Sequence, residues 1–201
     1  MEKDTIIKII IGIVAIISCI IVVIIYNKKP DNGLLKGKHY VEIIVKDYGK
    51  IKLELDADIA PITVTNFIDL VNNKFYDGLT FHRIIEGFMI QGGGFDINGN
   101  HKESKTIKGE FSKNGIKNNI SHKRGVISMA RATSLNSASS QFFIVHENHE
   151  DLDGNYAGFG HVIEGIEVVD KIAEYSNPID NNGSISLEER PIIESIRVVK
   201  K

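Results

Sequence analysis

Short stretches of alternating apolar and polar residues dominate the chain from about residue 40 onward and set the strongest limit on its fold. Apolar side chains occupy every second position over residues 41–45 and again over residues 51–55, and Asp47-Tyr48-Gly49 separates the two stretches. A period of two on both sides of a short polar turn predicts a β-hairpin. Further short apolar runs separated by glycine-rich or polar turns follow, and Ile192–Val199 is predicted to form the last strand.

Only two stretches have the helical period. The first begins at Ala60-Pro61, where proline suits a first helical turn, and its apolar stripe consists of Val64, Phe67, Ile68 and Val71. The second stripe consists of Ile166, Val169, Ile172 and Ala173. Many short strands with two helices are typical of a closed antiparallel barrel or a sandwich. Residues 97–122 are rich in Lys, Asn, Gly and Ser and are predicted to form a long surface loop, a kind of segment that often has a function in a compact domain.

The first residues of the chain have a different composition. Ile9–Tyr26 is an uncharged run of eighteen residues, nearly all of them Ile, Val or Ala. As a helix it would be about 27 Å long, close to the roughly 30 Å hydrocarbon core of a bilayer. It is longer than the apolar region of a cleavable signal peptide and is not followed by an Ala-x-Ala-like site. We therefore expect residues 1–29 to be an uncleaved membrane anchor with a transmembrane helix over about residues 6–26.

Residues 30–38 are expected to be a linker, because the segment around them is polar and contains Pro30 and Gly33. The folded domain is then expected over residues 39–201. Cys19, the only cysteine, lies inside the apolar run and excludes an intrachain disulfide. It leaves an alternative open, because Ile16-Ile17-Ser18-Cys19 loosely resembles a lipoprotein box, in which the cysteine would carry a lipid after cleavage.

Charge limits the possible partners. Residues 1–40 hold six basic and three acidic residues, so that the rest of the chain has 24 − 6 = 18 basic and 26 − 3 = 23 acidic residues, a net charge of −5. No basic patch indicates nucleic acid, and we expect no such partner. The histidines are scattered. Two segments, DING (residues 96–99) and DNNG (residues 180–183), look like fragments of calcium loops but lack the other ligands, and we expect both to be turns. We expect no metal site and no cofactor.

Two segments contain the residues that most strongly indicate a functional site. Residues 81–94, FHRIIEGFMIQGGG, place Arg83 and Gln91 among large apolar residues before three glycines, which we expect to permit a close turn at the end of the strand. Residues 140–145, SQFFIV, are the second segment. Because residues two apart share a face of a strand, Met89 lies beside Gln91, and Gln141 beside Phe143. Together with Arg83 they predict a pocket with an apolar floor and a polar rim. The alternative is that the apolar residues are core and the amides face solvent.

These segments support a resemblance. FHRIIEGFMIQGGG, GVISMARA (residues 125–132), SQFFI (residues 140–144) and LDGNYAGFGHVIEG (residues 152–165) resemble, in this order, the cyclophilin-type peptidyl-prolyl cis-trans isomerases. The likeness covers about residues 39–200, and IKGEF (residues 107–111) is similar to the bacterial branch. The resemblance implies a mainly β fold, a closed eight-stranded antiparallel β-barrel capped by two α-helices, with the site on the outer face of the barrel.

The resemblance also implies the site residues. Arg83 matches the catalytic arginine that approaches the prolyl nitrogen. The residues matching the substrate pocket are Phe88, Met89, Gln91, Ala130, Arg131, Gln141, Phe143, Leu152 and Tyr156. The substrates implied are proline-containing polypeptides, whose folding the enzyme would assist at the membrane, with the domain expected on the extracytoplasmic side. An alternative is a tethered proline-segment binding module or chaperone with little turnover.

The sequence departs from the well-known eukaryotic members at three positions. Asp151 stands where they have a tryptophan, Tyr156 where a histidine is usual, and Arg131 where an asparagine is usual. In the family the tryptophan is associated with cyclosporin binding, so the resemblance leaves cyclosporin binding in doubt. Arg83 and the apolar pocket are retained.

Overall fold

The computed structural model describes residues 33–201, and Leu34–Lys201 form one compact unit. The predicted anchor (residues 1–29), Cys19 and the first three residues of the predicted linker (30–32) lie outside the described residues. No helix within residues 33–201 is long and apolar enough to cross a membrane.

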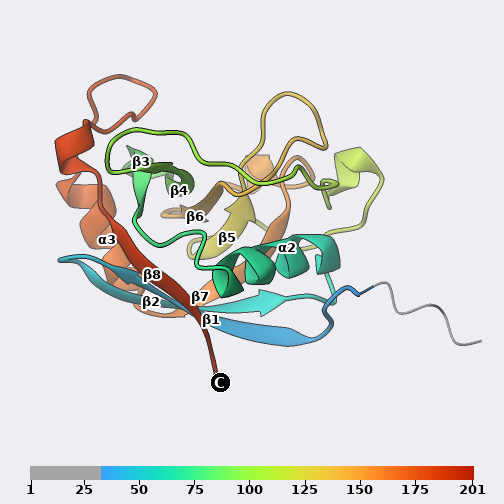
Figure 1. The fold of residues 1–201 in the computed structure, drawn as a ribbon. Coiled ribbons are helices and arrows are strands. Elements are labelled where there is room, and N and C mark those ends of the chain that lie inside the picture. The colour runs from blue at the N-terminus through green and yellow to red at the C-terminus, as the bar shows by residue number, and fades with distance from the viewer. Residues whose placement is uncertain (1–32) are drawn as a thin grey trace, which may run out of the picture. The chain divides into compact units, whose positions relative to one another are not determined.

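The described unit is mainly β, with eight strands, two α-helices and three short 3-10 helices (Figure 1). The strands are β1 (Lys38–Val45), β2 (Gly49–Asp56), β3 (Leu79–Ile85), β4 (Met89–Asp96), β5 (Val126–Met129), β6 (Phe142–Val145), β7 (Gly158–Glu164) and β8 (Ile193–Val199). The α-helices are α2 (Pro61–Asn72) and α3 (Ile166–Tyr175), and the 3-10 helices are η1 (Ser112–Asn114), η2 (Glu150–Leu152) and η3 (Leu187–Glu189).

All strand pairs are antiparallel, and the strands follow the order β3-β4-β6-β5-β7-β2-β1-β8 in one sheet. The sheet forms a half-barrel. Its edge strands meet at the bridge between Thr80 and Ile192, supported by backbone hydrogen bonds of 2.9 Å from Gly78 N to Ile193 O and from Phe81 N to Pro191 O. The predicted strand and helix numbers are confirmed. A fully closed barrel is not shown. The edge strands are joined by the single bridge from Thr80 of β3 to Ile192, just before β8, whereas every other pair of neighbouring strands has several paired residues.

The first hairpin agrees with its sequence pattern. Val41, Ile43 and Val45 of β1 are buried and face the buried residues of β2, and Val45 pairs with Gly49 across the turn. Asp47 has a φ of 65° and Gly49 a φ of 125°, which lets the chain reverse direction within a few residues. The alternating apolar residues therefore place one face of each strand in the core, as predicted.

Both predicted helices are present and bury the predicted stripes against the same core as the sheet interior. Pro61 is at the first position of α2, and the side chain of Ala60 makes no cap. The cap comes instead from Glu110, 2 % exposed, whose carboxylate accepts hydrogen bonds from Ile62 N (3.1 Å), Thr63 N (2.8 Å) and Thr63 Oγ1 (2.7 Å). A carboxylate is favourable at a helix N-terminus because it satisfies free N–H groups and opposes the positive end of the dipole.

Glu110 belongs to the predicted long loop, residues 97–122, which is mostly irregular and contains η1. Within it Phe111 is buried, and Asn118 Nδ2 donates to the carbonyl oxygens of both Glu110 and Gly158 at 2.8 Å. The loop is thus tied to α2 at one point and to the start of β7 at another.

Candidate functional site

The outer face of the sheet carries a second apolar cluster, separate from the interior core. Its buried members are Met89, Val126, Phe143 and Val145, and partly buried residues including Phe88, Leu152 and Tyr156 pack against them. β4 and β6 are neighbours in the sheet, and Gln91 pairs with Phe143. The predicted faces are therefore correct, and the two strands bring their pocket residues side by side.

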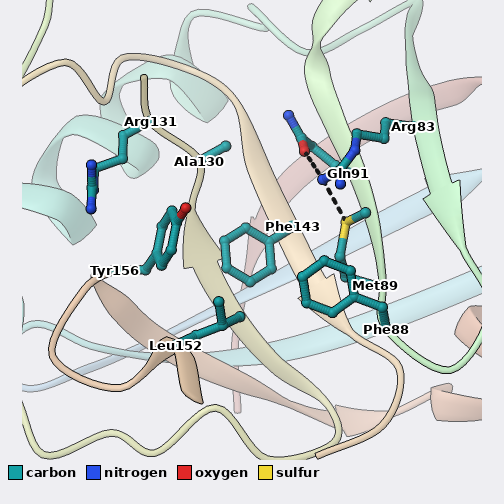
Figure 2. A pocket seen from close by; sticks show the side chains of 9 residues that line it. All are labelled: Arg83, Phe88, Met89, Gln91, Ala130, Arg131, Phe143, Leu152 and Tyr156. Atoms are coloured by element: carbon teal, nitrogen blue, oxygen red, sulfur yellow. Dashed lines mark hydrogen bonds between the residues drawn. The ribbon is translucent and has the colours of Figure 1, made fainter. Parts of the chain in front are cut away.

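A pocket of about 120 Å³ opens in this cluster (Figure 2). It is lined by Arg83, Phe88, Met89, Gln91, Ala130, Arg131, Phe143, Leu152 and Tyr156. These are nine of the ten residues that the sequence analysis assigned to the site. Phe143 forms the floor, and Arg83 and Arg131 lie on opposite sides (Figure 2). Met89 and Phe143 are 1 % and 5 % exposed. They are thus buried, as the alternative interpretation expected of core residues, but they also line the pocket.

Arg83 is held by four neighbours, one of which is Met89, whose Sδ accepts from Arg83 Nη1 at 3.9 Å. Its Nη1 donates to Gln91 Oε1 at 3.2 Å on the paired strand β4, and its Nε donates to the carbonyl oxygen of Asn182 at 2.7 Å. Its guanidinium carbon lies 5.9 Å from the centre of the Phe88 ring, a distance at which a cation is attracted to an aromatic face. These contacts hold the planar group at the edge of the apolar pocket.

The tenth predicted residue, Gln141, precedes β6 and lies beside the pocket. Its Oε1 accepts from Gln91 Nε2 at 3.0 Å, which extends the polar row Arg83–Gln91–Gln141. Gln141 lines an adjoining hollow of about 270 Å³, which shares Gln91, Ala130 and Arg131 with the first. The structure thus brings all ten residues together around two connected hollows.

The three glycines after Gln91 do not end the strand, and the expectation of a turn there is wrong. They lie within β4, which continues to Asp96. A Cβ on Gly92 would lie 2.8 Å from the carbonyl oxygen of Thr80, and one on Gly94 would lie 2.6 Å from the Gln141 side chain. The glycines are therefore needed for close approach, of β3 at Gly92 and of the Gln141 side chain at Gly94.

Arg131 is fixed at the opposite rim. Its Nε donates to the carbonyl oxygen of Asn155 at 2.9 Å and its Nη1 to that of Ala132 at 2.9 Å. The guanidinium carbon lies 4.8 Å from the ring centre of Tyr156 and 5.2 Å from that of Phe111. The pocket wall at Tyr156 is thus backed by a stacked cation, and a second positive charge stands at the rim.

Burial affects the protonation of Arg83 and of its neighbour His82. It lowers the pKa of Arg83 below its ordinary value, but an arginine side chain remains protonated in proteins. Burial and the nearby charge of Arg190 lower the pKa of His82 to about 4. His82 is accordingly neutral at pH 7, and Arg83 is the charged member of this pair.

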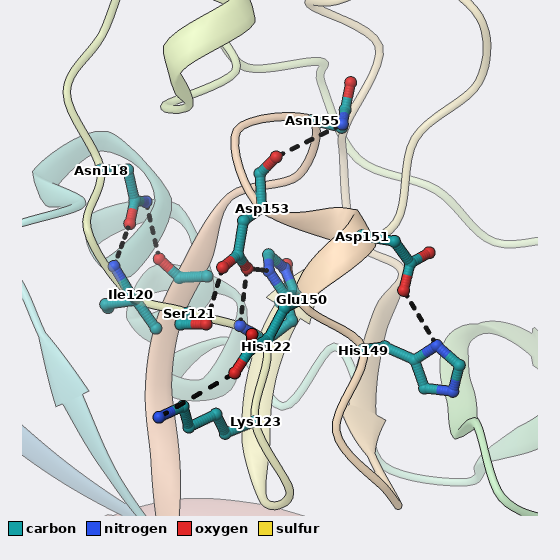
Figure 3. A network of polar contacts seen from close by, with 12 residues as sticks. Asn118, Ile120, Ser121, His122, Lys123, His149, Glu150, Asp151, Asp153 and Asn155 are labelled. Atoms are coloured by element: carbon teal, nitrogen blue, oxygen red, sulfur yellow. Dashed lines mark hydrogen bonds and ion pairs between the residues drawn. The ribbon is translucent and has the colours of Figure 1, made fainter.

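Asp151, which stands in place of the family's tryptophan, directs its side chain to solvent beside Leu152. It is 73 % exposed and its Oδ1 lies 3.1 Å from His149 Nδ1 (Figure 3). The ring that packs on Phe88 in this region is that of His149, at a centroid distance of 4.5 Å.

Sequence reasoning missed several contributors. The Asp180–Gly183 turn is a turn, as expected, with Asp180 Oδ1 accepting from Asn182 N and Ser184 N. Nothing in its local sequence indicates that Asn182 supports Arg83, 99 positions away. The same is true of His146 and His149, which bind the turn between β3 and β4. In the part of the chain that the structure describes, no three His, Cys, Asp or Glu side chains are grouped to hold a metal ion.

Comparisons with known proteins agree with the geometry. Residues 40–199 match the family model "Cyclophilin type peptidyl-prolyl cis-trans isomerase/CLD". Among curated proteins, the chain is 42% identical over 166 residues to peptidyl-prolyl cis-trans isomerase A of Dickeya dadantii, covering 79% of this chain and 84% of the relative. It is 39% identical over 161 residues to peptidyl-prolyl cis-trans isomerase B of Escherichia coli, covering 76% of this chain and 95% of the relative.

A solved structure is also similar. The crystal structure of a cyclophilin type peptidyl-prolyl cis-trans isomerase of Cryptosporidium parvum, determined in the presence of the dipeptide Ala-Pro, superposes with a TM-score of 0.66 at 30% sequence identity. The match covers 81% of this chain and 99% of that one. Fold, family model and relatives agree, and this chain belongs to the cyclophilin-type peptidyl-prolyl cis-trans isomerases.

Proposed function

We propose that the pocket on the outer face of the sheet is where this isomerase accelerates rotation about X-Pro bonds, with the proline ring over Phe143 and Arg83 acting on the prolyl nitrogen. Isomerase function itself follows from the family match and from relatives that carry that name. The single observation that carries the assignment of the site is Arg83, held by Asn182 and Gln91 at the edge of an apolar pocket.

The chemistry requires a donor at the nitrogen. The X-Pro bond resists rotation because the nitrogen shares its lone pair with the carbonyl, with a barrier of roughly 18–20 kcal/mol. In the twisted transition state this conjugation is lost, and the lone pair returns to nitrogen, which becomes a better acceptor. A donor placed there binds the transition state more tightly than either ground state and so lowers the barrier.

Arg83 suits this role. Its guanidinium has five N–H groups and stays protonated, so donors remain for a ligand after the bonds to Asn182 and Gln91. The reaction breaks no covalent bond and transfers no proton to the enzyme. The apolar floor of Phe143, Met89 and Leu152 would hold the ring, and the Gln91–Gln141 pair would bind the peptide backbone beside it.

The test uses the full-length chain in detergent and a protease-free assay of a proline-containing peptide by NMR exchange. Arg83→Ala is expected to lower kcat/KM by about 10²–10³-fold, the usual loss when one preorganised donor is removed. Arg83→Lys should restore only part of it, because an ammonium lacks the planar fork. Arg197→Ala, on β8, is the matched control for removing an arginine. Full activity of Arg83→Ala would overturn the proposal.

The same assay examines the alternative of a tethered binding module. A module that binds proline segments with little turnover would bind the peptide without accelerating its exchange, and Arg83→Ala would change affinity alone. Rate enhancement that disappears with Arg83 excludes it.

We further propose that residues 6–26 anchor the enzyme in the cell membrane with the domain on the extracytoplasmic side, where it assists protein folding. The uncharged run Ile9–Tyr26 supports the anchor; the orientation is an expectation from where anchored folding helpers act. External protease added to intact cells should degrade the domain, and a protected domain would overturn the orientation. The mass of the mature amino terminus distinguishes the lipid-anchored form at Cys19 from the uncleaved chain.

The substitution at Asp151 supports a proposal about inhibition. Because a solvent-directed carboxylate replaces an aromatic ring beside Leu152, we expect weak binding of cyclosporin. Titration of the chain with cyclosporin measures this, and tight binding would contradict it.

A further inference from the structure

The turn between β3 and β4 is held by two histidines from a distant segment. Gly87, with a φ of 76°, lies in this turn, and its N–H donates to His146 Nδ1 at 2.9 Å. Its carbonyl oxygen lies 3.0 Å from His149 Nε2. The N–H and the C=O of this one residue are thus both bound by residues that follow β6.

The contacts of His146 define its protonation state. A ring nitrogen that accepts a hydrogen bond carries no proton, so Nδ1 is bare. His146 Nε2 lies 3.3 Å from Asp170 Oδ1 on α3, where a proton is required. Arg124 Nη1 donates to the backbone oxygen of His146 at 2.9 Å and pairs with Asp170 at 2.7 Å, and Glu147 Oε2 would lie 4.0 Å from a Cβ placed on Gly87. The geometry therefore requires a neutral His146.

The contacts of His149 require the opposite state. Nε2 faces the carbonyl oxygen of Gly87, and Nδ1 faces the carboxylate oxygen of Asp151 at 3.1 Å (Figure 3). Both partners accept only, and a neutral imidazole has one N–H, so both bonds form only when the ring is protonated. The other charged groups on this segment are Glu147 and Glu150, and Lys123 from the segment before β5 lies 4.0 Å from Glu150. The backbone N–H of His149 donates to His122 O at 2.8 Å.

The two histidines also determine the position of Phe88, a wall of the pocket. The ring of His149 packs against that of Phe88 at a centroid distance of 4.5 Å and an angle of 63°. The backbone N–H of His146 donates to the carbonyl oxygen of Phe88 at 2.8 Å. Phe88 in turn lies under the guanidinium of Arg83. A movement of the Gly87 turn therefore displaces the surface on which Arg83 rests.

We propose that His146 and His149 are positioning residues of this isomerase, which together clamp Gly87 and hold the Phe88 wall in the geometry needed for catalysis. The clamp is complete only when His146 is neutral and His149 is protonated. A proton added to His146 removes the acceptor of Gly87 N–H, and a proton lost from His149 removes one of its two donors. Catalysis is therefore expected to fall on both sides of an optimum pH. The inference rests on the proposed function of the pocket.

The test is the pH profile of kcat/KM for the full-length chain, measured by peptide NMR exchange so that no coupling protease contributes its own pH dependence. The wild type is expected to show a bell-shaped profile. His146→Asn places an amide oxygen near the position of Nδ1 and should flatten the acidic limb. His149→Gln places an amide N–H near the position of Nε2 and should flatten the alkaline limb.

The alanine variants measure the size of the effect. His146→Ala and His149→Ala should each lower kcat/KM by about 10- to 100-fold, as small misplacements of a site do, while the amide variants retain most of the activity at the wild-type maximum. His161→Gln, on the exposed face of β7, is the matched control and should keep the wild-type profile. Profiles of both amide variants identical to that of the wild type would overturn the proposal.

A measurement on the wild type does not depend on any variant folding. Long-range ¹⁵N–¹H spectra at the pH of maximal activity should show His146 as the neutral Nε2–H tautomer and His149 as an imidazolium; a protonated His146 or a neutral His149 there overturns the clamp. Absence of turnover in the wild type contradicts the proposed function itself, whereas turnover with unchanged profiles contradicts the clamp alone.

Discussion

The two faces of β6 lie in different apolar environments. Phe142 and Ile144 belong to the interior core, where the Phe142 ring packs edge-on against Phe67 of α2 and Tyr76. Phe143 belongs to the outer cluster, where it packs edge-on against Tyr156 at 5.8 Å. All four residues of this strand are buried, which is why its sequence does not alternate. The interior face is enclosed, whereas the outer face is left open at one place, and that opening is the pocket.

The largest difference between the two faces of β6 is expected when one aromatic ring is removed from each. Phe142→Ala leaves an enclosed cavity in the core and is expected to lower the free energy of unfolding by about 3–5 kcal/mol. Phe143→Ala enlarges a pocket that is already open, so its loss of stability should be smaller and its loss of kcat/KM larger. Denaturant unfolding and peptide exchange measure the two quantities. Equal losses of stability with full activity in Phe143→Ala would contradict the distinction.

A second pair of substitutions makes the same distinction within β4. Gly92→Ala directs a methyl group against the backbone oxygen of Thr80 and should destabilise the fold by about 1–3 kcal/mol, as overpacking does.

Gly94→Ala instead meets the flexible side chain of Gln141, which supplies the nearest atoms, and the side chain can move away at the cost of its bond to Gln91, so that stability changes little. Loss of the Gln91–Gln141 bond should lower kcat/KM by about 2- to 10-fold, equivalent to one hydrogen bond of roughly 0.5–1.5 kcal/mol. Thermal unfolding and kinetics of both variants test this, and a reversed order of effects would show that Gly94 serves the fold.

The smallest expected effect concerns the ion pair between Arg197 of β8 and Asp77, which lies shortly before β3. Arg197 of β8 binds both carboxylate oxygens of Asp77 at 2.7 Å and thereby lowers the pKa of Asp77. Because the folded-state pKa lies below the unfolded value of about 3.9, the stabilisation is present above that pH and is lost as the pH falls through the folded-state pKa.

Asp77→Asn should therefore cost about 0.5–1 kcal/mol at pH 7, in the range of partly exposed pairs, and the cost should disappear as the pH falls through the folded-state pKa of Asp77. Activity at pH 7 should not change, because neither Asp77 nor Arg197 lines the pocket. Unfolding of both proteins across this pH range measures it, and a difference that persists in acid would contradict the assignment.

Periodicity predicted the first hairpin, both helices and the last strand, because each buries one face and repeats with its own period. It failed at Gly92-Gly93-Gly94, where the reason for glycine is the approach of Thr80 and Gln141 from other segments. The sequence pattern also did not predict the cap of α2, because Glu110 lies 47 positions from Thr63.

The sequence alone determined the chemistry of the site: two arginines, two amides, a tyrosine and apolar side chains, in motifs whose order resembles one family. Tertiary structure decided what holds that chemistry in place. Asn182 supports Arg83, and His146 and His149 bind the Gly87 turn, across separations of 99, 59 and 62 positions. These contacts are made by backbone groups and single polar side chains, which leave no periodic signal, so they exist only once the sheet has brought the segments together.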